Sequence, residues 1–205
     1  MDTKEEIVPA FFCVPDITGF TKFITTSDIN FSRSVISTIL AKLVKANMLK
    51  MEVAEIEGDA VIFYKTGRLP AFKQICKQCD LLLKEFYDYI KEIKTKDEAN
   101  YNLYFDGQIG LKIIIHFGKV IKTRIHNRVK LIGEDVIVVH KLLKNGIPES
   151  EYILVTDAYL KKIKFNTNDT LFDWSKLTQC SESYDYIGEV HYRYIPVDVE
   201  KYLHS

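Results

Sequence analysis

Two short runs rich in β-branched and aromatic residues, 51–56 and 60–65, are separated only by Glu57, Gly58 and Asp59, which predicts a β-hairpin. The hairpin lies between two long stretches, 31–49 and 70–94, in which apolar residues recur at helical spacing. Further strands are expected at 10–14, 110–116, 119–124, 152–155 and in a closing hairpin at 184–197, and further helices at 135–144 and 158–163. Because helices alternate with antiparallel pairs, the pattern predicts an α+β fold: a central, mostly antiparallel sheet with helices packed on one face.

The boundaries of these elements follow from local signals. The strand 10–14 is flanked by prolines and ends at Asp16, and Asn30 or Ser32 caps the helix that follows. Pro70 opens the second long helix. Thr156 or Asp157 caps the short helix expected at 158–163. The polar segment 95–107 is the one plausible insertion, so we expect a single domain over residues 1–205.

Composition restricts the partners of the chain. Hydrophobic residues make up 47% and charged residues 27%, which is ordinary for a globular protein. The 28 basic and 28 acidic side chains cancel, so no long-range field favours nucleic acid or an anionic membrane. We find no signal-peptide pattern and no run of about 20 apolar residues that could cross a bilayer. A cytoplasmic location is expected.

Cysteines and histidines are interpreted as structural residues. Cys76 and Cys79 form a CxxC pair, but both fall on the apolar face of the helix expected at 70–94, and no second pair is spaced to complete a zinc site. His116, His140 and His191 lie within expected strands or helices, where a hydrogen-bonded structural role is more common than catalysis. His140 is the histidine with the strongest case for a functional role, because it adjoins Lys141 on the helix that would face the site.

Two carboxylates, Asp16 in PDITGFT and Asp59 in EIEGDAVIFY, each lie beside a glycine-containing turn at the end of a strand. If these strands pair, the carboxylates can share Mg²⁺ or Mn²⁺, which prefer oxygen ligands and accept phosphate in their shell. The turn formed by Thr18, Gly19 and Phe20 would then offer backbone N–H groups to a triphosphate. A simpler alternative is that each aspartate forms an Asx turn or helix cap.

The segments PDITGFTKF and EIEGDAVIFY, separated by a long helix, resemble the two metal motifs of class III adenylate and guanylate cyclases. KLIGEDVIVVHKLL, ILVTDAYLKKI and YIGEVHYRYIPV resemble later segments of the same family, so the resemblance covers nearly the whole chain. It implies a ferredoxin-like class III nucleotide cyclase fold. It also implies a phosphorus–oxygen lyase in which the ribose 3′-oxygen attacks the α-phosphorus of a nucleoside triphosphate and releases pyrophosphate.

Carried over residue by residue, the resemblance makes Asp16 and Asp59 the metal ligands, assisted by the backbone carbonyl of Ile17. Glu55 falls at the base-selecting position, where guanylate cyclases have glutamate and adenylate cyclases have lysine. The second base-selecting position falls on Lys130, which fits neither usual partner. The expected cofactor is Mg²⁺ or Mn²⁺.

The second half of the chain departs from the family pattern. Ile137 stands where the family has asparagine, Lys141 where it has the transition-state arginine, and Ile187 where it has a phosphate-binding lysine. Lys141 keeps a charge but lacks the bidentate geometry of arginine. A shifted alignment would instead bring His140, Lys144 or Asn145 into place.

In the resembling family the site lies between two chains, so a homodimer or a cyclase-like partner chain is implied. Three functions remain open. The first is a divergent cyclase, and the second is a degenerate cyclase-like domain that binds metal and nucleotide or serves as a dimerisation module without turnover. The third is a plain interaction domain on the same fold, since a fold alone does not fix function.

Overall fold

The structure, a computed structural model, describes residues 6–104, 109–163 and 171–204. Its strands are β1 (Ile7–Thr18), β2 (Glu52–Glu57), β3 (Ala60–Thr66), β4 (Gly110–Ile125), β5 (Arg128–Ile132), β6 (Tyr152–Thr156), β7 (Thr178–Tyr184) and β8 (Gly188–Pro196). Its helices are α1 (Phe20–Thr26), α2 (Ile29–Lys45), α3 (Phe72–Lys96), α4 (Glu98–Tyr104), α5 (Glu134–Leu142), α6 (Asp157–Leu160), the 3₁₀ turn η1 (Trp174–Lys176) and α7 (Glu200–Leu203).

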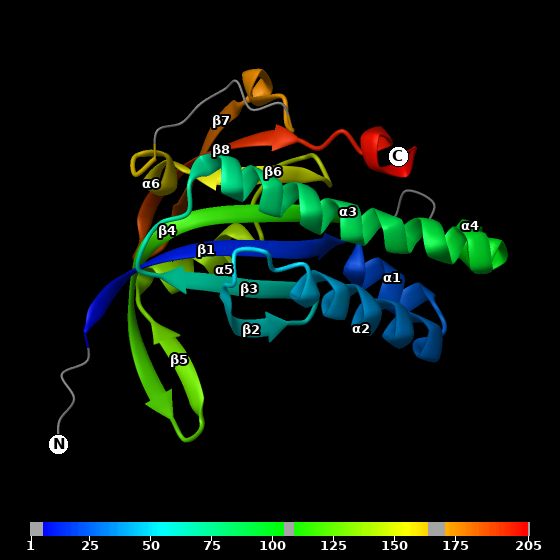
Figure 1. The fold of residues 1–205 in the computed structure, drawn as a ribbon, viewed down its shortest axis with the longest axis horizontal. Helices are drawn as coiled ribbons and strands as arrows, with labels where there is room; N and C mark the ends of the chain where they lie inside the picture. Colours follow the sequence, from blue (N-terminus) through cyan, green and yellow to red (C-terminus); the bar gives the residue numbers. More distant parts are fainter. Residues whose placement is uncertain (1–5, 105–108, 164–170, 205) are drawn as a thin grey trace.

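The strands form one sheet in the order β2-β3-β1-β4-β6-β8-β7, and β5 pairs with the far half of β4 (Figure 1). Every pairing is antiparallel except that of β4 with β6. The prediction of an α+β fold with a central, mostly antiparallel sheet is therefore confirmed.

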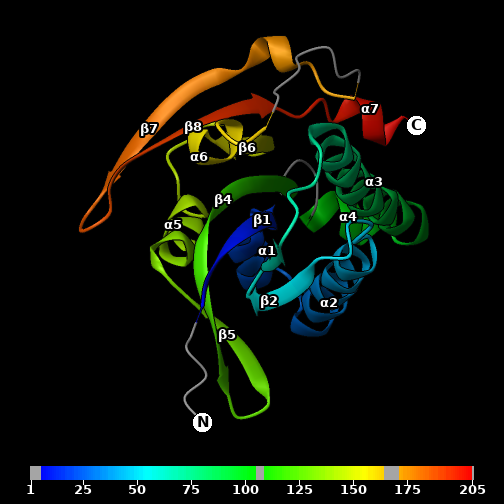
Figure 2. The ribbon, with the colours of Figure 1, turned by 60° about the vertical axis from the view of Figure 1, so that its left-hand side comes forward.

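Both faces of the sheet are covered, which corrects the expectation of helices on one face. Along β1, Phe11 and Cys13 join the core beneath α2 and α3, whereas Phe12 and Val14 join a second core beneath α5. Figure 2 shows α5 on the opposite side of β1 and β4 from α2 and α3. A strand buried on both faces is apolar at successive positions, so alternation could not reveal the second helix layer.

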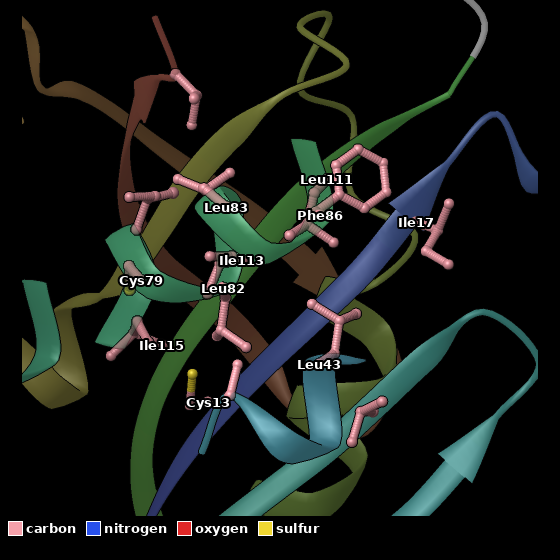
Figure 3. Close-up of a cluster of buried hydrophobic side chains, with 14 of the residues drawn as sticks. Cys13, Ile17, Leu43, Cys79, Leu82, Leu83, Phe86, Leu111, Ile113 and Ile115 are labelled. Atoms are coloured by element: carbon pink, nitrogen blue, oxygen red, sulfur yellow. The ribbon is translucent and has the colours of Figure 1, made fainter. Parts of the chain in front are cut away.

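The core beneath α3 is the larger one. Leu82, Leu83 and Phe86 of α3 pack over Ile113 of β4 and Leu43 of α2 (Figure 3). Cys79 and Cys13 lie in the same cluster, and Cys76 is also buried, as expected for core thiols. Full burial of each large apolar side chain contributes about 1.5–3 kcal/mol, so this helix anchors one face of the sheet.

Several boundaries differ from the prediction. The cap of α2 is Asp28, whose carboxylate accepts from the N–H groups of Asn30 and Phe31, rather than Asn30 or Ser32. Part of the expected loop at 95–107 forms α4, and the closing hairpin begins at Thr178 rather than at 184. Thr156 caps α6 as predicted, accepting from the N–H of Tyr159.

The largest difference is β4, which runs unbroken through Gly118 where two strands were expected. Its second half leaves the body of the sheet with β5 as a two-stranded arm, visible at the lower edge of Figures 1 and 2. Ile125, Val129 and Ile132 on this arm are 56%, 42% and 49% exposed. Among the described helices, none is long and apolar enough to span a membrane.

Candidate functional site

A proline shapes the end of β1 that carries the first carboxylate. The ladder between β1 and β3 is continuous from Ala10 to Cys13, is interrupted at Val14 and Pro15, and resumes where Asp16 pairs with Ala60. Proline has no N–H to donate, which accounts for the interruption. Beyond it, the N–H of Ile17 donates to the carbonyl oxygen of Asp59 at 3.2 Å. Strand pairing therefore brings the Asp16 and Asp59 segments side by side.

Strand alternation then decides where each side chain points. Ile17 is buried in the core beneath α3, and Asp16 faces the opposite side of the sheet, the side covered by α5. The Gly58–Asp59 turn between β2 and β3 places Asp59 at the same end, and the left-handed backbone of Gly58, with φ 61°, makes this tight turn possible.

Asp16 and Asp59 line one open cavity of about 440 Å³. The residues expected to bind phosphate, Thr18, Gly19 and Phe20, line it as well. The remaining lining residues are Ile17, Thr21, Lys22, Glu57, Ala60, Lys112, Leu143 and Lys144. The structure thus brings the six predicted metal and phosphate residues of the first half together around one hollow.

Lys112 also lines this cavity, and the sequence did not predict it as a site residue. It lies directly across from Asp16 on β4, and its Nζ is 3.0 Å from Asp16 Oδ2 and donates to the carbonyl of Leu143 at 2.7 Å. Both side chains of this ion pair are largely buried. The available signal was a lone lysine in the apolar strand 110–116, but its partner depends on the register of two strands about a hundred residues apart.

The two aspartates interact electrostatically. Burial raises the pKa of Asp59 from 3.8 to about 6, and repulsion from Asp16 adds to the rise. Burial also raises the pKa of Asp16, although the charge and hydrogen bond of Lys112 oppose it. Two carboxyl groups crowded in this way favour binding of an additional cation, which would let both ionise.

The donor set fits a hard divalent cation that keeps water or phosphate ligands. Two carboxylates and the backbone at Ile17 supply oxygen, the donor that Mg²⁺ and Mn²⁺ prefer. Thr18 lines this hollow, and its buried Oγ1 has no hydrogen-bond partner among the described residues. Within the same part of the chain, no group of three or more His, Cys, Asp and Glu side chains forms a closed metal site.

The two predicted base-selecting residues pair with each other. Lys130 Nζ on β5 donates to Glu55 Oε2 on β2 at 3.1 Å, and both side chains are about half exposed. The carboxylate of Glu55 is thus shared with a lysine of the same chain.

The second-half residues lie elsewhere. Ile137 on α5 is 51% exposed, Lys141 is exposed one turn further along the helix, and neither lines the cavity. Ile187 lines a separate hollow beside Glu189 and His191. Of the shifted candidates, Lys144 lines the carboxylate cavity.

The other two shifted candidates have partners within the chain. His140 Nδ1 lies 2.7 Å from Glu57 Oε2. Asn145 donates to Leu142 and to the hydroxyl of Tyr152.

His116 forms a buried network on the α5 side of the sheet. Its Nε2 lies 3.0 Å from Asp135 Oδ1 and its Nδ1 3.0 Å from Thr156 Oγ1. An ionised carboxylate only accepts, so Nε2 carries a proton and donates to Asp135. Burial raises the pKa of Asp135, but bonds from His116 and from the Lys119 N–H outweigh it and leave the pKa below its usual range. This histidine is hydrogen-bonded at both nitrogens.

The sequence profile of DUF2652, described as a protein of unknown function, matches residues 36–152, more than half of the chain. The uncharacterised protein Rv2561/Rv2562 of Mycobacterium tuberculosis is 27% identical over 146 residues, which cover 71% of this chain and 66% of that protein. The match thus spans just under two thirds of the mycobacterial protein's length.

Among solved structures, a bacterial light-regulated adenylyl cyclase is 16% identical with a TM-score of 0.62, covering 97% of this chain and 94% of that one. The guanylyl cyclase Cya2 is 12% identical with a TM-score of 0.63, covering 92% of both chains. The guanylate cyclase domain of RhGC from Catenaria anguillulae, solved with GTP, is 13% identical with a TM-score of 0.62, covering 94% and 98%. At these identities the likeness establishes the fold, which is that of adenylyl and guanylyl cyclase domains.

Proposed function

The chain belongs to the DUF2652 family of proteins of unknown function. We propose that it is a divergent nucleotide cyclase, which binds a nucleoside triphosphate together with Mg²⁺ or Mn²⁺ at Asp16 and Asp59. The observation that carries the proposal is the shared cavity of these two carboxylates, with Thr18, Gly19 and Phe20 on its wall. Two crowded acidic groups beside a polar turn are suited to a metal–triphosphate complex.

In this proposal Asp16, Asp59 and the carbonyl of Ile17 hold the metal, and Thr18, Gly19 and Phe20 contact the phosphates. A bound divalent cation supplies charge neutralisation of the phosphates and activation of the ribose 3′-oxygen. Lys112 neutralises the charge of Asp16 when no metal is bound, and in this proposal it becomes free to bind a phosphate oxygen once the metal takes that role. Lys144 lines the same cavity. Positioning and electrostatics then favour in-line attack on the α-phosphorus.

Base selection in this proposal depends on Glu55 and Lys130. A glutamate accepts from the guanine N1–H and exocyclic amine, whereas its ion pair with Lys130 at 3.1 Å competes for the same oxygen. The lysine can instead donate to a base acceptor once the pair opens.

A homodimer, or a cyclase-like partner chain, completes the proposal. The three exposed apolar residues of the β4–β5 arm, Ile125, Val129 and Ile132, supply apolar area for such a contact. Lys141 on α5 is exposed and would be presented to the carboxylate site of the other chain.

A second candidate function is binding without turnover. It is favoured by Ile137 and Ile187, whose side chains can neither orient a ribose nor neutralise a phosphate. In this case the domain acts as a metal- and nucleotide-binding or dimerisation module.

The experiment combines binding and product analysis. Purified protein is heated with Mn²⁺ and each of the four nucleoside triphosphates, and the melting temperature is compared with that of Asp59→Asn and of Asp185→Asn, a control aspartate in the turn of the β7–β8 hairpin. We expect a rise for the wild type and for the control, and none for Asp59→Asn. The absence of a rise with every triphosphate would refute both the cyclase and the nucleotide-binding module.

Mass spectrometry of the same mixtures separates the two candidates. Pyrophosphate together with a 3′,5′-cyclic nucleotide supports the cyclase, whereas a melting shift with intact triphosphate supports the binding module. Light scattering at several protein concentrations, with Val129→Asp as the variant, tests the proposed dimer.

A further inference from the structure

A second hollow, of about 430 Å³, lies at the other end of the β2–β3 hairpin from Asp59. It forms where β3 ends at Thr66 and α3 begins at Phe72, and the loop between α2 and β2 closes its side. Its lining residues are Met48, Leu49, Lys50, Lys65, Arg68, Leu69, Pro70, Ala71 and Gln74. None of them lines the carboxylate cavity, so the two hollows are separate.

Three of the lining residues, Lys50, Lys65 and Arg68, are cations, and none is a carboxylate. Among the described residues, none of these three cations forms an ion pair: no carboxylate oxygen lies within 4.0 Å of its side-chain nitrogens. In a chain whose charges sum to zero, three unpaired cations around one hollow form a local excess of positive charge. Such an excess attracts an anion.

Lys65 is the best fixed of the three. It is partly buried at the end of β3, and its Nζ donates to the carbonyl of Leu49 at 2.8 Å, which holds the ammonium at the wall and leaves its other protons available. Lys50 and Arg68 are exposed; Lys50 precedes Lys65 in the sequence and Arg68 follows it.

The loop that forms the wall is also held firmly. Gln78, a fully buried residue of α3, accepts from the N–H of Leu49 at 3.1 Å and donates to the carbonyl of Ala46 at 2.8 Å. Asn47 bonds both the N–H and the carbonyl of Met51. These bonds hold Lys50 in a left-handed backbone conformation, φ 53°, which residues with a side chain rarely adopt. The wall is therefore ordered before any ligand binds.

The start of α3 adds to the positive potential. This helix is 25 residues long, and its first turn contains no acidic residue to balance the positive end of the helix dipole. Its first turn carries Lys73 instead.

We propose that this hollow binds the phosphate group of a small phosphorylated molecule, with Lys50, Lys65 and Arg68 contacting the phosphate. The apolar part of the ligand would lie on Met48, Leu69 and Pro70, which line the same hollow. The site does not depend on the carboxylate cavity or on a divalent metal, so it goes beyond the proposed cyclase function.

The test is calorimetric titration of the whole chain, in EDTA, with inorganic phosphate and with phenyl phosphate. Lys65→Met/Arg68→Gln removes two charges from the hollow. Arg124→Gln/Arg128→Gln is the matched control, because it removes two charges from the exposed β4–β5 arm. Asp59→Asn, which disables the proposed metal site, is titrated in parallel.

We expect both phosphates to bind wild type, the arm variant and Asp59→Asn with equal affinity. Phenyl phosphate should bind more tightly than phosphate because its ring buries apolar area. In Lys65→Met/Arg68→Gln the affinity should fall at least about tenfold, since two charge-assisted hydrogen bonds are lost. Far-ultraviolet circular dichroism verifies that this variant is folded, and Lys50→Gln, whose side chain is exposed, serves as a second variant.

Three results would overturn the proposal: no binding at millimolar phosphate, equal affinity in the pocket variants and the wild type, or an equal loss in the arm variant. Asp59→Asn removes a negative charge from the carboxylate cavity, so a changed affinity in this variant, with the pocket variants unchanged, would assign the phosphate to that cavity and likewise refute a separate site. A failure of the nucleotide experiments leaves these titrations unaffected, because no metal is present.

Discussion

Replacing Asp59 with asparagine should stabilise the metal-free protein at neutral pH. Asp59 has a pKa raised from 3.8 to about 6, by burial first and by repulsion from Asp16 second. A folded-state pKa above the unfolded value means that the folded protein binds more protons between these pH values. The contribution of Asp59 to stability is thus fully present below about pH 4 and is lost as pH rises through about 6. Asparagine carries no charge at any of these values.

The magnitude follows from the two pKa values. The difference between 3.8 and about 6 corresponds to about 3 kcal/mol at 1.36 kcal/mol per pH unit, as an upper bound. Asp59 is partly exposed, so solvent screening reduces the expected gain to about 1–2 kcal/mol. Urea unfolding in EDTA at pH 4, 5, 6, 7 and 8 measures it: the wild type should lose stability relative to Asp59→Asn between pH 4 and 6, and the difference should then level off.

Addition of Mn²⁺ at pH 7 should reverse the order, because the cation binds the ionised pair of the wild type. Asp185→Asn is the control and should follow the wild type under all conditions. If Asp59→Asn is less stable than the wild type in EDTA at pH 7, or shows the same pH dependence, the two carboxyl groups do not interact as described.

Three further variants test other parts of the site. Lys112→Met leaves a buried carboxylate without its cation and should lower the free energy of unfolding at pH 7 by about 3 kcal/mol, measured in urea. Gly118→Ala places a Cβ 2.0 Å from Cγ of Asp135, which hydrogen bonds hold in place, and should cost about 2–3 kcal/mol in the same assay. Lys130→Ala should change stability by less than about 0.5 kcal/mol, yet raise the melting shift with GTP relative to ATP by releasing Glu55.

Each of these variants has a control or an opposing result. Gly146→Ala brings a Cβ only to an ordinary contact of 3.5 Å and should be nearly neutral, in contrast to Gly118→Ala. Wild-type stability in Lys112→Met would show that Asp16 needs no cation. An unchanged GTP-to-ATP ratio in Lys130→Ala would exclude the ion pair from base selection.

Local patterns predicted most elements of the fold, because hairpin turns and helical spacing act over a few residues. They failed where tertiary structure decided the outcome. Gly118 was expected to separate two strands, whereas it lies inside β4, at a point where the Asp135 carboxylate approaches the backbone too closely for any side chain. The placement of α5 on the second face was hidden because β1 is apolar at successive positions.

The candidate site was predictable as far as it depends on sequence motifs. Asp16 and Asp59 stand beside glycine turns, and strand pairing brings them to one cavity. Lys112 and the contact of Lys130 with Glu55 were not predictable, because each depends on the register or position of strands that are distant in sequence. The basic hollow was missed for the same reason, because Lys50 lies in the loop before β2 and Lys65 on β3.

The unbroken strand β4 also limits how the gene for this domain can change in length. Lys112 and His116 lie on the same strand and on the same face, four positions apart, and both function through partners on other elements. Inserting or deleting one codon between them would turn one of the two toward the α3 side. Beyond Ile121, β5 is the one partner of β4 in the described part of the chain, and added or lost pairs of residues there alter the length of the arm. We therefore expect homologous genes to vary in length in the arm and to keep a constant spacing from residue 110 to residue 121.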